Sequence, residues 1–462
     1  RVTLTLDKMA NGGIYDHLAG GIARYSTDPN WLVPHFEKMP YDQALVSGVY
    51  LEAFQVTGNR RYAEVASQIL NCVLADMKST EGVFYSAWDA DSEGVEGKYY
   101  VWTKPEIMAA LGEHEGEVFC SYYDVTEEGN WEDANILNVQ RAPEVVARLH
   151  GITETHLEEM LRRAREKLLL VRTRRVPPAL DDKTLTAWNA LMITSLARAA
   201  GVLGEQRYAD AASAAADFIL THLIDDGRLL RTYRNGRAHT RAYLDDYAFL
   251  VEALLELHQA TFDWRWFERA IQLNDEMLRL FWDDRDGAFY FTASDGESLF
   301  ARTKDFRDGA VPSGNAVAIM NLLRLGTILG RDDLREKAEQ SLRAVAGDLL
   351  HGPFSHERLL AAVDLFCCPG TEIVIAGDVT DVATQELIAI ARQGCDPART
   401  VLLKKGDACD GTVGRVHVPA LKDKTALRGN AAAYVCHGHT CHAPVTSPAD
   451  LGDLLHRVCR EA

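Results

Sequence analysis

The sequence contains no long apolar run, and it is poor in basic residues. A membrane-spanning helix needs about 20 consecutive apolar residues, and no stretch of the 462 residues approaches that. Lys and Arg number 49 against 67 Asp and Glu, giving a formal charge of −18. Because a chain this acidic repels phosphate groups, neither nucleic acid nor an anionic membrane is an expected partner. The 47% of apolar and 25% of charged residues are typical of a soluble globular protein.

A disulfide framework is also missing. Nine cysteines, an odd number, are scattered without regular spacing. This pattern favours a reducing compartment in which most thiols are buried as small apolar groups, so the cytoplasm is the predicted location. No secretory signal peptide is visible, although the chain opens at Arg1 without an initiator Met.

One stretch, "CHGHTCH", nevertheless gathers thiols and imidazoles: Cys436, His437, His439, Cys441 and His442. Zinc sites need a second, distant pair of ligands, and a thioredoxin-type redox pair needs the spacing C-x-x-C, so neither motif is matched. Buried structural thiols are favoured for Cys436 and Cys441, with a disulfide or weak metal binding as alternatives. No other metal and no cofactor is predicted.

What the sequence does contain is an internal repeat. "YDQALVSGVYLEAFQVTGNRRYAEVASQILNCVLADM" (41–77) parallels "LDDYAFLVEALLELHQATFDWRWFERAIQLNDEMLRLF" (244–281), and Asp42 precedes Tyr62 by the same 20 residues as Asp246 precedes Trp266. Segments 188–223 and 313–350 follow the same plan. Apolar residues three and four apart predict two amphipathic helices in each copy, joined by a short turn that contains Gly.

Helical hairpins of this kind cannot bury their apolar faces alone, so they stack on neighbouring hairpins. Four copies, together with candidate helices in 1–25, 104–122, 153–172 and 355–366, predict a mainly α fold, an (α/α)6 toroid over residues 1–366. An open superhelix is the alternative, since closure is not written in the sequence. From about 369 onward, "TEIVIAGD" and "RTVLLKKGD" predict strands around a helix, and hence a small α/β module over 367–462.

The first helix of each repeat begins with polar or aromatic residues. Equivalent helix starts lie on one rim of a toroid, so these residues are expected to converge on a central cavity. Asp, Asn and Ser are also favoured N-caps, each stabilising by about 1 kcal/mol, and capping explains any single position equally well. The repeated aromatic partner favours a sugar site, because aromatic faces stack on pyranose rings while polar groups hold hydroxyls. The residues concerned are Tyr41, Asp42, Trp188, Asn189, Asp245, Asp246, Tyr247, Ser313 and Asn315.

Other polar groups precede the same helix starts. "WLVPHFEKMPYDQA" (31–44) adds His35 and Glu37 before the first repeat, and these two have no counterpart in the other repeats. "WDADSEG" resembles a calcium loop, but Tyr100 stands where the bidentate Glu is needed, so a hairpin carrying Asp89 and Asp91 is predicted instead. "DDK" brings Asp182 and Lys183 ahead of Trp188.

These segments resemble the YyaL family, which includes proteins of the spermatogenesis-associated protein 20 type. The segments concerned are "GGIYDHLAGGIARYSTDPNWLVPHFEKMPYDQAL", "GVFYSAWDADSEGVEGKYYVWT", "DDKTLTAWNALMI", "DGAVPSGNA" and "AYVCHGHTCHAPV". The resemblance covers nearly the whole chain. It implies a thioredoxin-like domain ahead of Arg1, followed by a toroid similar to N-acylglucosamine 2-epimerases and six-hairpin glycosidases. Pro40 and Ala23 depart from the family pattern, so the His that many members carry at position 23 is not essential here.

Three functions are consistent with these observations, and an enzyme is favoured. The first is a carbohydrate-active or carbohydrate-binding protein, using His and carboxylates for epimerase-like or glycosidase-like acid–base chemistry. The second is a thiol or metal module, and the third is a non-catalytic scaffold; both are compatible with a thioredoxin-like partner domain. The candidate catalytic residues are His35, Glu37, Asp42, Asp89, Asp182 and Asp246. The candidate substrate-binding residues are His17, Arg24, Tyr25, Tyr41, Asp91, Lys183, Trp188, Asn189, Asp245, Tyr247, Ser313 and Asn315.

Overall fold

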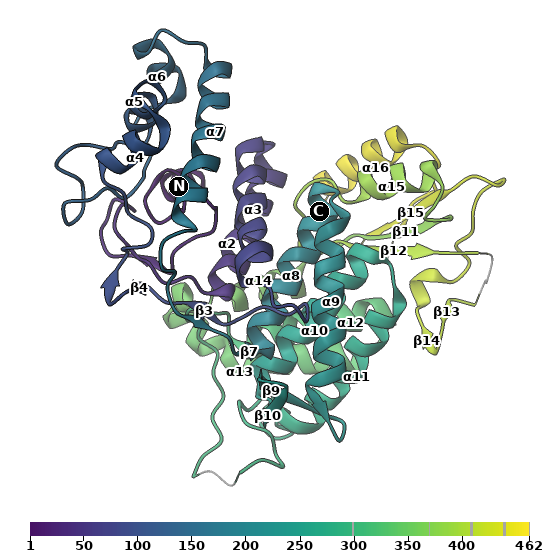
Figure 1. The fold of residues 1–462 in the computed structure, drawn as a ribbon. Coiled ribbons are helices and arrows are strands. Elements are labelled where there is room, and N and C mark those ends of the chain that lie inside the picture. The colour runs from purple at the N-terminus through teal and green to yellow at the C-terminus, as the bar shows by residue number, and fades with distance from the viewer. Residues whose placement is uncertain (298–299, 369, 407–409, 438–439, 462) are drawn as a thin grey trace. The chain divides into compact units, whose positions relative to one another are not determined.

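The computed structural model describes residues 1–297, 300–368, 370–406, 410–437 and 440–461. The chain divides into two compact units, Arg1–Thr184 and Leu185–Ala462. Both are built mainly from helices with short strands between them (Figure 1), which is the predicted mainly α class. Closure into a six-hairpin toroid and a domain boundary near residue 366 stay predictions. Among the described residues, no helix has the length and apolarity of a membrane span.

The first unit contains the first helical hairpin. Helix α2 begins at Pro40, because a proline at the first helical position loses no backbone hydrogen bond, and it ends at Gly58, whose φ of 70° suits glycine. The predicted second helix follows at once and continues as a π-helix. The helices of this unit are α1 (Val2–Asn11), α2 (Pro40–Thr57), α3 (Arg60–Cys72), η1 (Val73–Met77), α4 (Lys104–Leu111), α5 (Glu113–Tyr122), α6 (Pro143–Leu149) and α7 (Glu154–Arg172).

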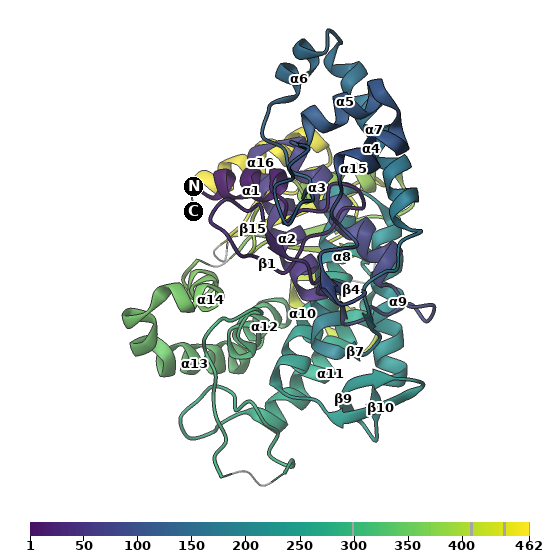
Figure 2. The same cartoon turned by 60° about the vertical axis from the view of Figure 1, so that its left-hand side comes forward.

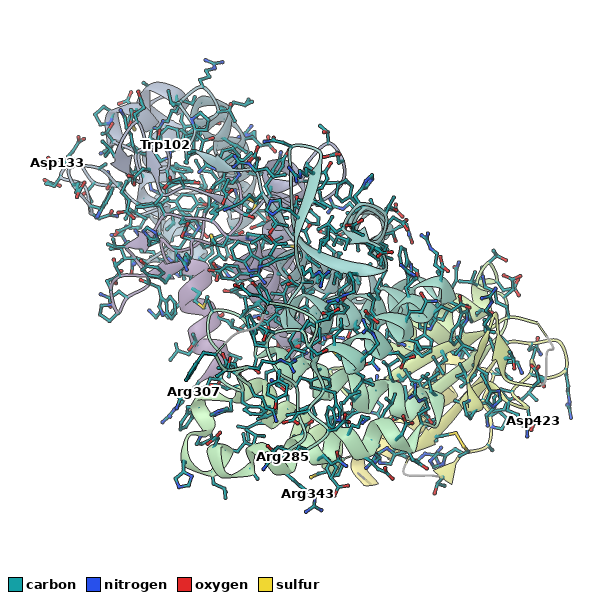
Figure 3. The ribbon with its side chains drawn as sticks, turned by 90° about the horizontal axis from the view of Figure 1, so that it is seen from below. Trp102, Asp133, Arg285, Arg307, Arg343 and Asp423 are labelled. Carbon is teal, nitrogen blue, oxygen red and sulfur yellow. A yellow bond between two sulfur atoms is a disulfide. The ribbon has the colours of Figure 1, made fainter. Side chains whose placement is uncertain are left out.

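Helices α4 to α7 pack around a core of their own. Trp102, which is fully buried, lies in this core, whereas Asp133 points outward (Figure 3). The short strands tie the connecting loops of the unit together: β1 pairs with β2, β3 with β6, and β4 with β5, all antiparallel. They are β1 (Tyr25–Ser26), β2 (Pro34–His35), β3 (Ala87–Trp88), β4 (Asp91–Ser92), β5 (Val95–Glu96) and β6 (Leu180–Asp181); β7 (Thr184–Leu185) follows at the division between the units.

The second unit contains the other three predicted hairpins. The first helices of the hairpins, α8, α10 and α12, pack against one another in that order, and each is buried around most of its circumference. Their partners α9, α11 and α13 bury one face only. Figure 2 shows α14 beside α12 and α13. The helices are α8 (Thr186–Leu203), α9 (Gln206–His222), α10 (Leu244–Thr261), α11 (Trp264–Phe281), α12 (Gly314–Leu329), α13 (Asp332–His351) and α14 (Glu357–Cys367), with a 3-10 turn η2 (Pro353–Ser355).

A mixed sheet follows in the same unit. Its strand order is β12-β11-β15-β16, with β11 and β12 parallel and the other pairs antiparallel. Helices α15 (Val382–Ala391) and α16 (Pro448–Glu461) cover one face (Figure 1). The remaining elements of the second unit are β8 (Ile224–Asp225), β9 (Arg228–Arg234), β10 (Arg237–Arg241), β11 (Glu372–Ala376), β12 (Thr400–Lys404), β13 (Thr412–Val413), β14 (Val416–His417), η3 (Pro419–Leu421), β15 (Ala432–His437) and β16 (Thr440–Cys441).

Candidate functional site

The first unit contains a cavity of about 420 Å³, a size that suits a small organic ligand. Its wall includes Arg24, Tyr25, Trp31 and Asp42, and the sequence predicted three of these four, all but Trp31. The rest of the lining is formed by Met9, Ile14, Ile22, Ala23, Ser26, Asp28, Pro29 and Val46.

The loop that carries Trp31 is held in an unusual conformation. Trp31 has a φ of 64°, which a bulky residue rarely adopts. Its carbonyl accepts a hydrogen bond from the Ile14 N–H at 3.2 Å. A Cβ on Gly12 would lie 2.3 Å from that carbonyl oxygen, so the glycine permits the loop to approach. The carboxylate of Asp28 accepts bonds from the N–H groups of Asn30 and Val33 and closes the loop.

Asp42 lies in the first turn of α2, and it is the titratable group best placed for chemistry. Its Oδ2 atom is buried and accepts no hydrogen bond from any residue in the described part of the chain. Burial raises the pKa of Asp42 to about 7; Arg24 opposes this shift and Glu37 adds to it. A carboxyl group that gains and loses its proton near neutral pH suits a general acid or base.

Behind this wall, charged and aromatic side chains fix Arg24 and Tyr25. Arg24 pairs with Glu37 at 2.9 Å and also hydrogen-bonds the Tyr41 hydroxyl. His35 lies 3.8 Å from Glu37 and 2.7 Å from Glu96, and its ring stacks on Tyr25 with centroids 5.0 Å apart. Six predicted residues therefore come together in the first unit: Arg24, Tyr25, His35, Glu37, Tyr41 and Asp42.

Glu96 belongs to the same cluster through its contact with His35, although no motif in the sequence points to it. The predicted hairpin does form, as β4 and β5. Its two turn residues, Glu93 and Gly94, both have positive φ, which is typical of a tight hairpin turn. The carboxylate that this hairpin brings to His35 is Glu96, on β5, and not one of the predicted aspartates.

The other candidates of the first unit lie away from the cavity wall. Asp89 and Asp91 are exposed, and Lys183 forms a partly exposed ion pair with Asp181 at 3.0 Å. In the ladder of β3 and β6, Ala87 lies opposite Asp181. With this register, Asp89 and Asp182 are offset by three residues along the strand direction, which corresponds to about 10 Å.

His17 lies beside a separate, smaller cavity of about 30 Å³. Its Nε2 is 2.9 Å from the Gly12 carbonyl oxygen. Burial lowers the pKa of His17 to about 4, so this imidazole is neutral at pH 7. The geometry suits a structural hydrogen bond better than the predicted substrate contact.

The first unit also contains a buried ionic cluster that was not predicted from the sequence. Asp16 accepts two hydrogen bonds from Arg172, at 2.9 and 2.8 Å, and a third from Lys38 at 2.7 Å. All three charged groups are buried, and both cations lie over the Tyr100 ring. Burial alone would raise the pKa of Asp16, but Arg172 and Lys38 hold it well below its ordinary value. Because 156 residues separate Asp16 from Arg172, no local spacing in the sequence indicates this cluster, and it is recognised only from the burial of its side chains in the folded chain.

In the second unit, Asp245 at the start of α10 resembles Asp42. Burial raises the pKa of Asp245 to about 7, Asp246 and Asp305 add to the shift, and Arg231 opposes it. Its Oδ1 lies against the start of α12, where a Cβ on Gly314 would stand 2.1 Å away. The glycine in "PSGN" therefore leaves room for this carboxylate. Trp188, at the start of α8, is half-buried.

The remaining candidates of the second unit are buried and bonded to backbone groups. Asp246 is fully buried and accepts bonds from the N–H groups of Ala187 and Tyr243. The hydroxyl of Tyr247 accepts a bond from Leu229 N–H, and Asn315 pairs with both backbone groups of Phe289. These buried side chains thus make structural hydrogen bonds. The predicted catalytic role of Asp246 and the predicted substrate contacts of Tyr247 and Asn315 stay predictions. Asn189 and Ser313 are likewise buried and hydrogen-bond backbone groups.

The prediction for the "CHGHTCH" stretch is corrected. Cys436 and Cys441 are joined by a disulfide between the paired strands β15 and β16. Cys441 is exposed and Cys436 half-buried, so they are not buried structural thiols, and a disulfide offers no thiolate to a metal. His439 lies outside the described residues.

Fold and cavity define a mainly helical protein of packed hairpins with a polar and aromatic pocket of small-molecule size. No model of a known protein family matches the chain. It is similar to spermatogenesis-associated protein 20 of Homo sapiens, with 36% identity over 488 residues that cover 98% of this chain and 62% of that protein. The Mus musculus protein of the same name is 35% identical over the same shares. An uncharacterized Caenorhabditis elegans protein, B0495.5, is 30% identical over 98% of this chain and 66% of its own length. The chain thus spans 62% of the length of these mammalian relatives.

Solved structures with a similar backbone course share little sequence with this chain. A sugar epimerase from a ruminal bacterium has a TM-score of 0.45 at 12% identity and covers 74% of this chain and 70% of that one. Cellobiose 2-epimerase from Bacillus thermoamylovorans has a TM-score of 0.41 at 10% identity, and the match covers 78% of this chain and 70% of the epimerase. Unsaturated glucuronyl hydrolase from Bacillus sp. GL1 has a TM-score of 0.38 at 13% identity, and the match covers 63% of this chain and 59% of the hydrolase.

Proposed function

We propose that the cavity of the first unit binds a sugar-like ligand and that Asp42 acts on it as a general acid or base. The observation that carries this proposal is that Asp42 lines a cavity of about 420 Å³ while its Oδ2 is buried and has no hydrogen-bond partner among the described residues. A pKa near 7 gives Asp42 the proton affinity that epimerisation or glycoside hydrolysis requires.

The other lining residues are suited to binding. Trp31 and Tyr25 offer aromatic surface to a pyranose ring, and Arg24 offers hydrogen-bond donors to its hydroxyls. His35 is not among the described lining residues, so we assign it a positioning role: held between Glu37 and Glu96, it supports the Tyr25 ring. Asp245, the other carboxyl with a pKa of about 7, is the candidate acid–base group of the second unit.

The wider assignment rests on the sequence motifs and on the similarity to spermatogenesis-associated protein 20. We propose that the chain is part of a YyaL-type protein and works beside a thioredoxin-like domain, in the cytoplasm. One observation favours the redox-linked alternative, in which that domain acts on this chain: the Cys436–Cys441 disulfide is partly exposed. In that case the two thiols of a reduced thioredoxin would supply two electrons and two protons and become a disulfide, while Cys436 and Cys441 would become two free thiols, countable with a thiol reagent.

A thermal-shift screen of mono- and disaccharides tests the carbohydrate proposal. At least one sugar should raise the melting temperature of the wild-type chain, and Arg24→Met should abolish that rise. Arg162→Met is the matched control, because Arg162 lies exposed on α7 and pairs only locally with Glu166. A screen in which no sugar shifts the wild type, or in which Arg24→Met responds as Arg162→Met does, would overturn the proposal.

A further inference from the structure

The second unit has a cavity of its own that nothing in the proposed function uses. Its volume is about 530 Å³, and it lies where β12 ends, between the turn from α10 to α11 and the loop around β13. The described residues that line it are Thr261, Phe262, Asp263, Trp264, Leu403, Lys404, Lys405, Gly411, Thr412, Val413 and Leu421.

Its position in the sheet is one that favours ligands. Strands β11 and β12 are parallel, and Lys404 is the last residue of β12, opposite Ala376 at the end of β11. In open α/β sheets, ligands bind beyond the carboxyl ends of parallel strands. The cavity occupies that place.

Lys404 carries the charge of the site. Only 5% of this residue is exposed, and its Nζ donates to the Leu421 carbonyl oxygen at 2.9 Å, so the ammonium group lies at the cavity wall. Within the described part of the chain, no carboxylate forms an ion pair with it. A buried ammonium has three N–H donors and is stable when an anion or further acceptors satisfy them.

Among the described residues of the wall, no carboxylate is left to pair with Lys404. Asp263 is the one acidic residue on the described wall, and its two oxygens accept bonds from the backbone N–H and the Nε of Arg265. Lys405 adds a second cation to the wall. The described wall therefore carries two lysines against one carboxylate, Asp263, which already pairs with Arg265; beyond the wall, Asp378 interacts with the charge of Lys405.

Aromatic side chains also line the cavity. Trp264, half-buried, has its ring 4.4 Å from the His258 ring and 5.4 Å from the Phe267 ring, and it lines the cavity beside Phe262. This packing holds the indole in place, as a stacking surface for a flat group requires.

We propose that this cavity binds a small organic anion, a phosphate or carboxylate attached to a flat ring. Lys404 and Lys405 pair with the anionic group, and Trp264 and Phe262 contact the ring. This ligand is independent of the sugar proposed for the first unit.

Isothermal titration of the full chain tests this, with phenyl phosphate and benzoate as ring anions and with phenol and inorganic phosphate as partial probes. Wild type should bind a ring anion saturably, and should bind each partial probe about tenfold more weakly or worse. The ratio of phenyl phosphate to benzoate affinity identifies phosphate or carboxylate as the preferred group. No saturable binding of either ring anion would overturn the proposal.

Two variants locate the site. Lys404→Met should weaken the better ring anion at least threefold, while Lys422→Met, on an exposed lysine outside the described lining, should bind as wild type does. Less than a threefold loss in Lys404→Met would refute the assignment. If circular dichroism shows that Lys404→Met is unfolded, Trp264→Leu decides: a loss of more than threefold for phenyl phosphate, with inorganic phosphate unchanged, supports the site, and any other result overturns it.

Discussion

At the scale of single residues, burial raises the pKa of Asp42, Asp245 and Asp246, and for the first two it raises the pKa to about 7. Asp42 and Asp245 each lie in the first turn of a helix, where the helix dipole favours the ionised form. Burial outweighs that effect and raises both pKa values to about 7. Burying a carboxyl group so that it stays protonated up to neutral pH does not stabilise the folded chain. A chemical role is therefore the better explanation for these buried carboxyl groups.

Asp42→Asn should stabilise the fold in a pH-dependent way. The folded-state pKa of Asp42, about 7, lies above the unfolded value of about 3.9. Between these two pH values, the folded chain therefore holds a proton on Asp42 that the unfolded chain has lost. As a result, the free energy of unfolding falls as the pH rises from about 4 to 7. We expect Asn to raise the free energy of unfolding by roughly 1–3 kcal/mol at pH 8 and little at pH 4.

Urea unfolding at the two pH values measures this, with Asp28→Asn as the control. Burial raises the pKa of Asp28. Hydrogen bonds from the backbone N–H groups of Val33 and Asn30 lower that pKa by more than burial raises it, so the net shift is downward. Asp28→Asn should therefore destabilise the fold at pH 8, the opposite sign. Equal stability of wild type and Asp42→Asn at pH 8 would contradict the buried, unpartnered carboxyl.

Asp16 has the opposite effect on stability from Asp42. Its depressed pKa means that its ionisation stabilises the fold above about pH 4 and that this contribution is lost as the pH falls further. Asp16→Asn leaves Lys38 and Arg172 buried without their counter-ion, and should cost about 3–5 kcal/mol at pH 7. Asp217→Asn, which breaks an exposed pair with Arg265, should cost less than about 1 kcal/mol. Similar losses in urea unfolding for the two variants would show that the Asp16 cluster is not buried as described.

At the scale of elements, helix starts determine where the polar groups lie. The spacing of apolar residues predicted all four hairpins, because each inner helix buries residues three and four apart. The same local pattern could not separate ligand contacts from caps. Asp42 and Asp246 occupy equivalent repeat positions, yet Asp42 faces a cavity and Asp246 caps its own helix with all its bonds made.

Contacts between distant segments explain what sequence reasoning missed. Glu96 reaches His35 across 61 residues, and the pairing of Lys38 with Asp16 spans 22. Neither partner follows a local spacing rule, so only the folded chain reveals them. The sequence supports the disulfide only as an alternative, because its cysteines match no motif. The register of β15 and β16, which pairs Cys436 with Cys441, brings them together.

Gly314→Ala tests the contact between two inner helices. The added Cβ would lie 2.1 Å from Oδ1 of Asp245, so α12 or the carboxylate must move, at a cost of about 1–3 kcal/mol. Gly347→Ala in α13 is the matched control, since nothing lies within 4 Å of its Cβ position. That change should stabilise the fold by roughly 0.5–1 kcal/mol, because alanine favours a helix interior over glycine. Thermal unfolding that gives the two variants the same sign would contradict the close approach of Asp245 to α12.

At the scale of the whole molecule, the two compact units each carry a cavity of ligand size, with different chemistry. The wall of the first combines aromatic rings with a protonatable carboxyl and an arginine, which suits a polyhydroxy ligand. The wall of the second combines lysines with aromatic rings, which suits an anion. The similarity to spermatogenesis-associated protein 20 extends through both units, since it covers 98% of the chain. It does not by itself name a reaction.

Proton NMR in D2O shows whether Asp42 performs acid–base chemistry on a sugar. Sugars that shift the melting temperature are incubated with wild type and with Asp42→Asn, and the spectra report exchange of a carbon-bound proton, inversion at a carbon, or cleavage of a glycosidic bond. We predict that wild type catalyses one of these changes and that Asp42→Asn slows it by about 10²-fold or more. A wild-type chain that binds sugars but changes none, or an Asp42→Asn variant as active as wild type, would contradict the account.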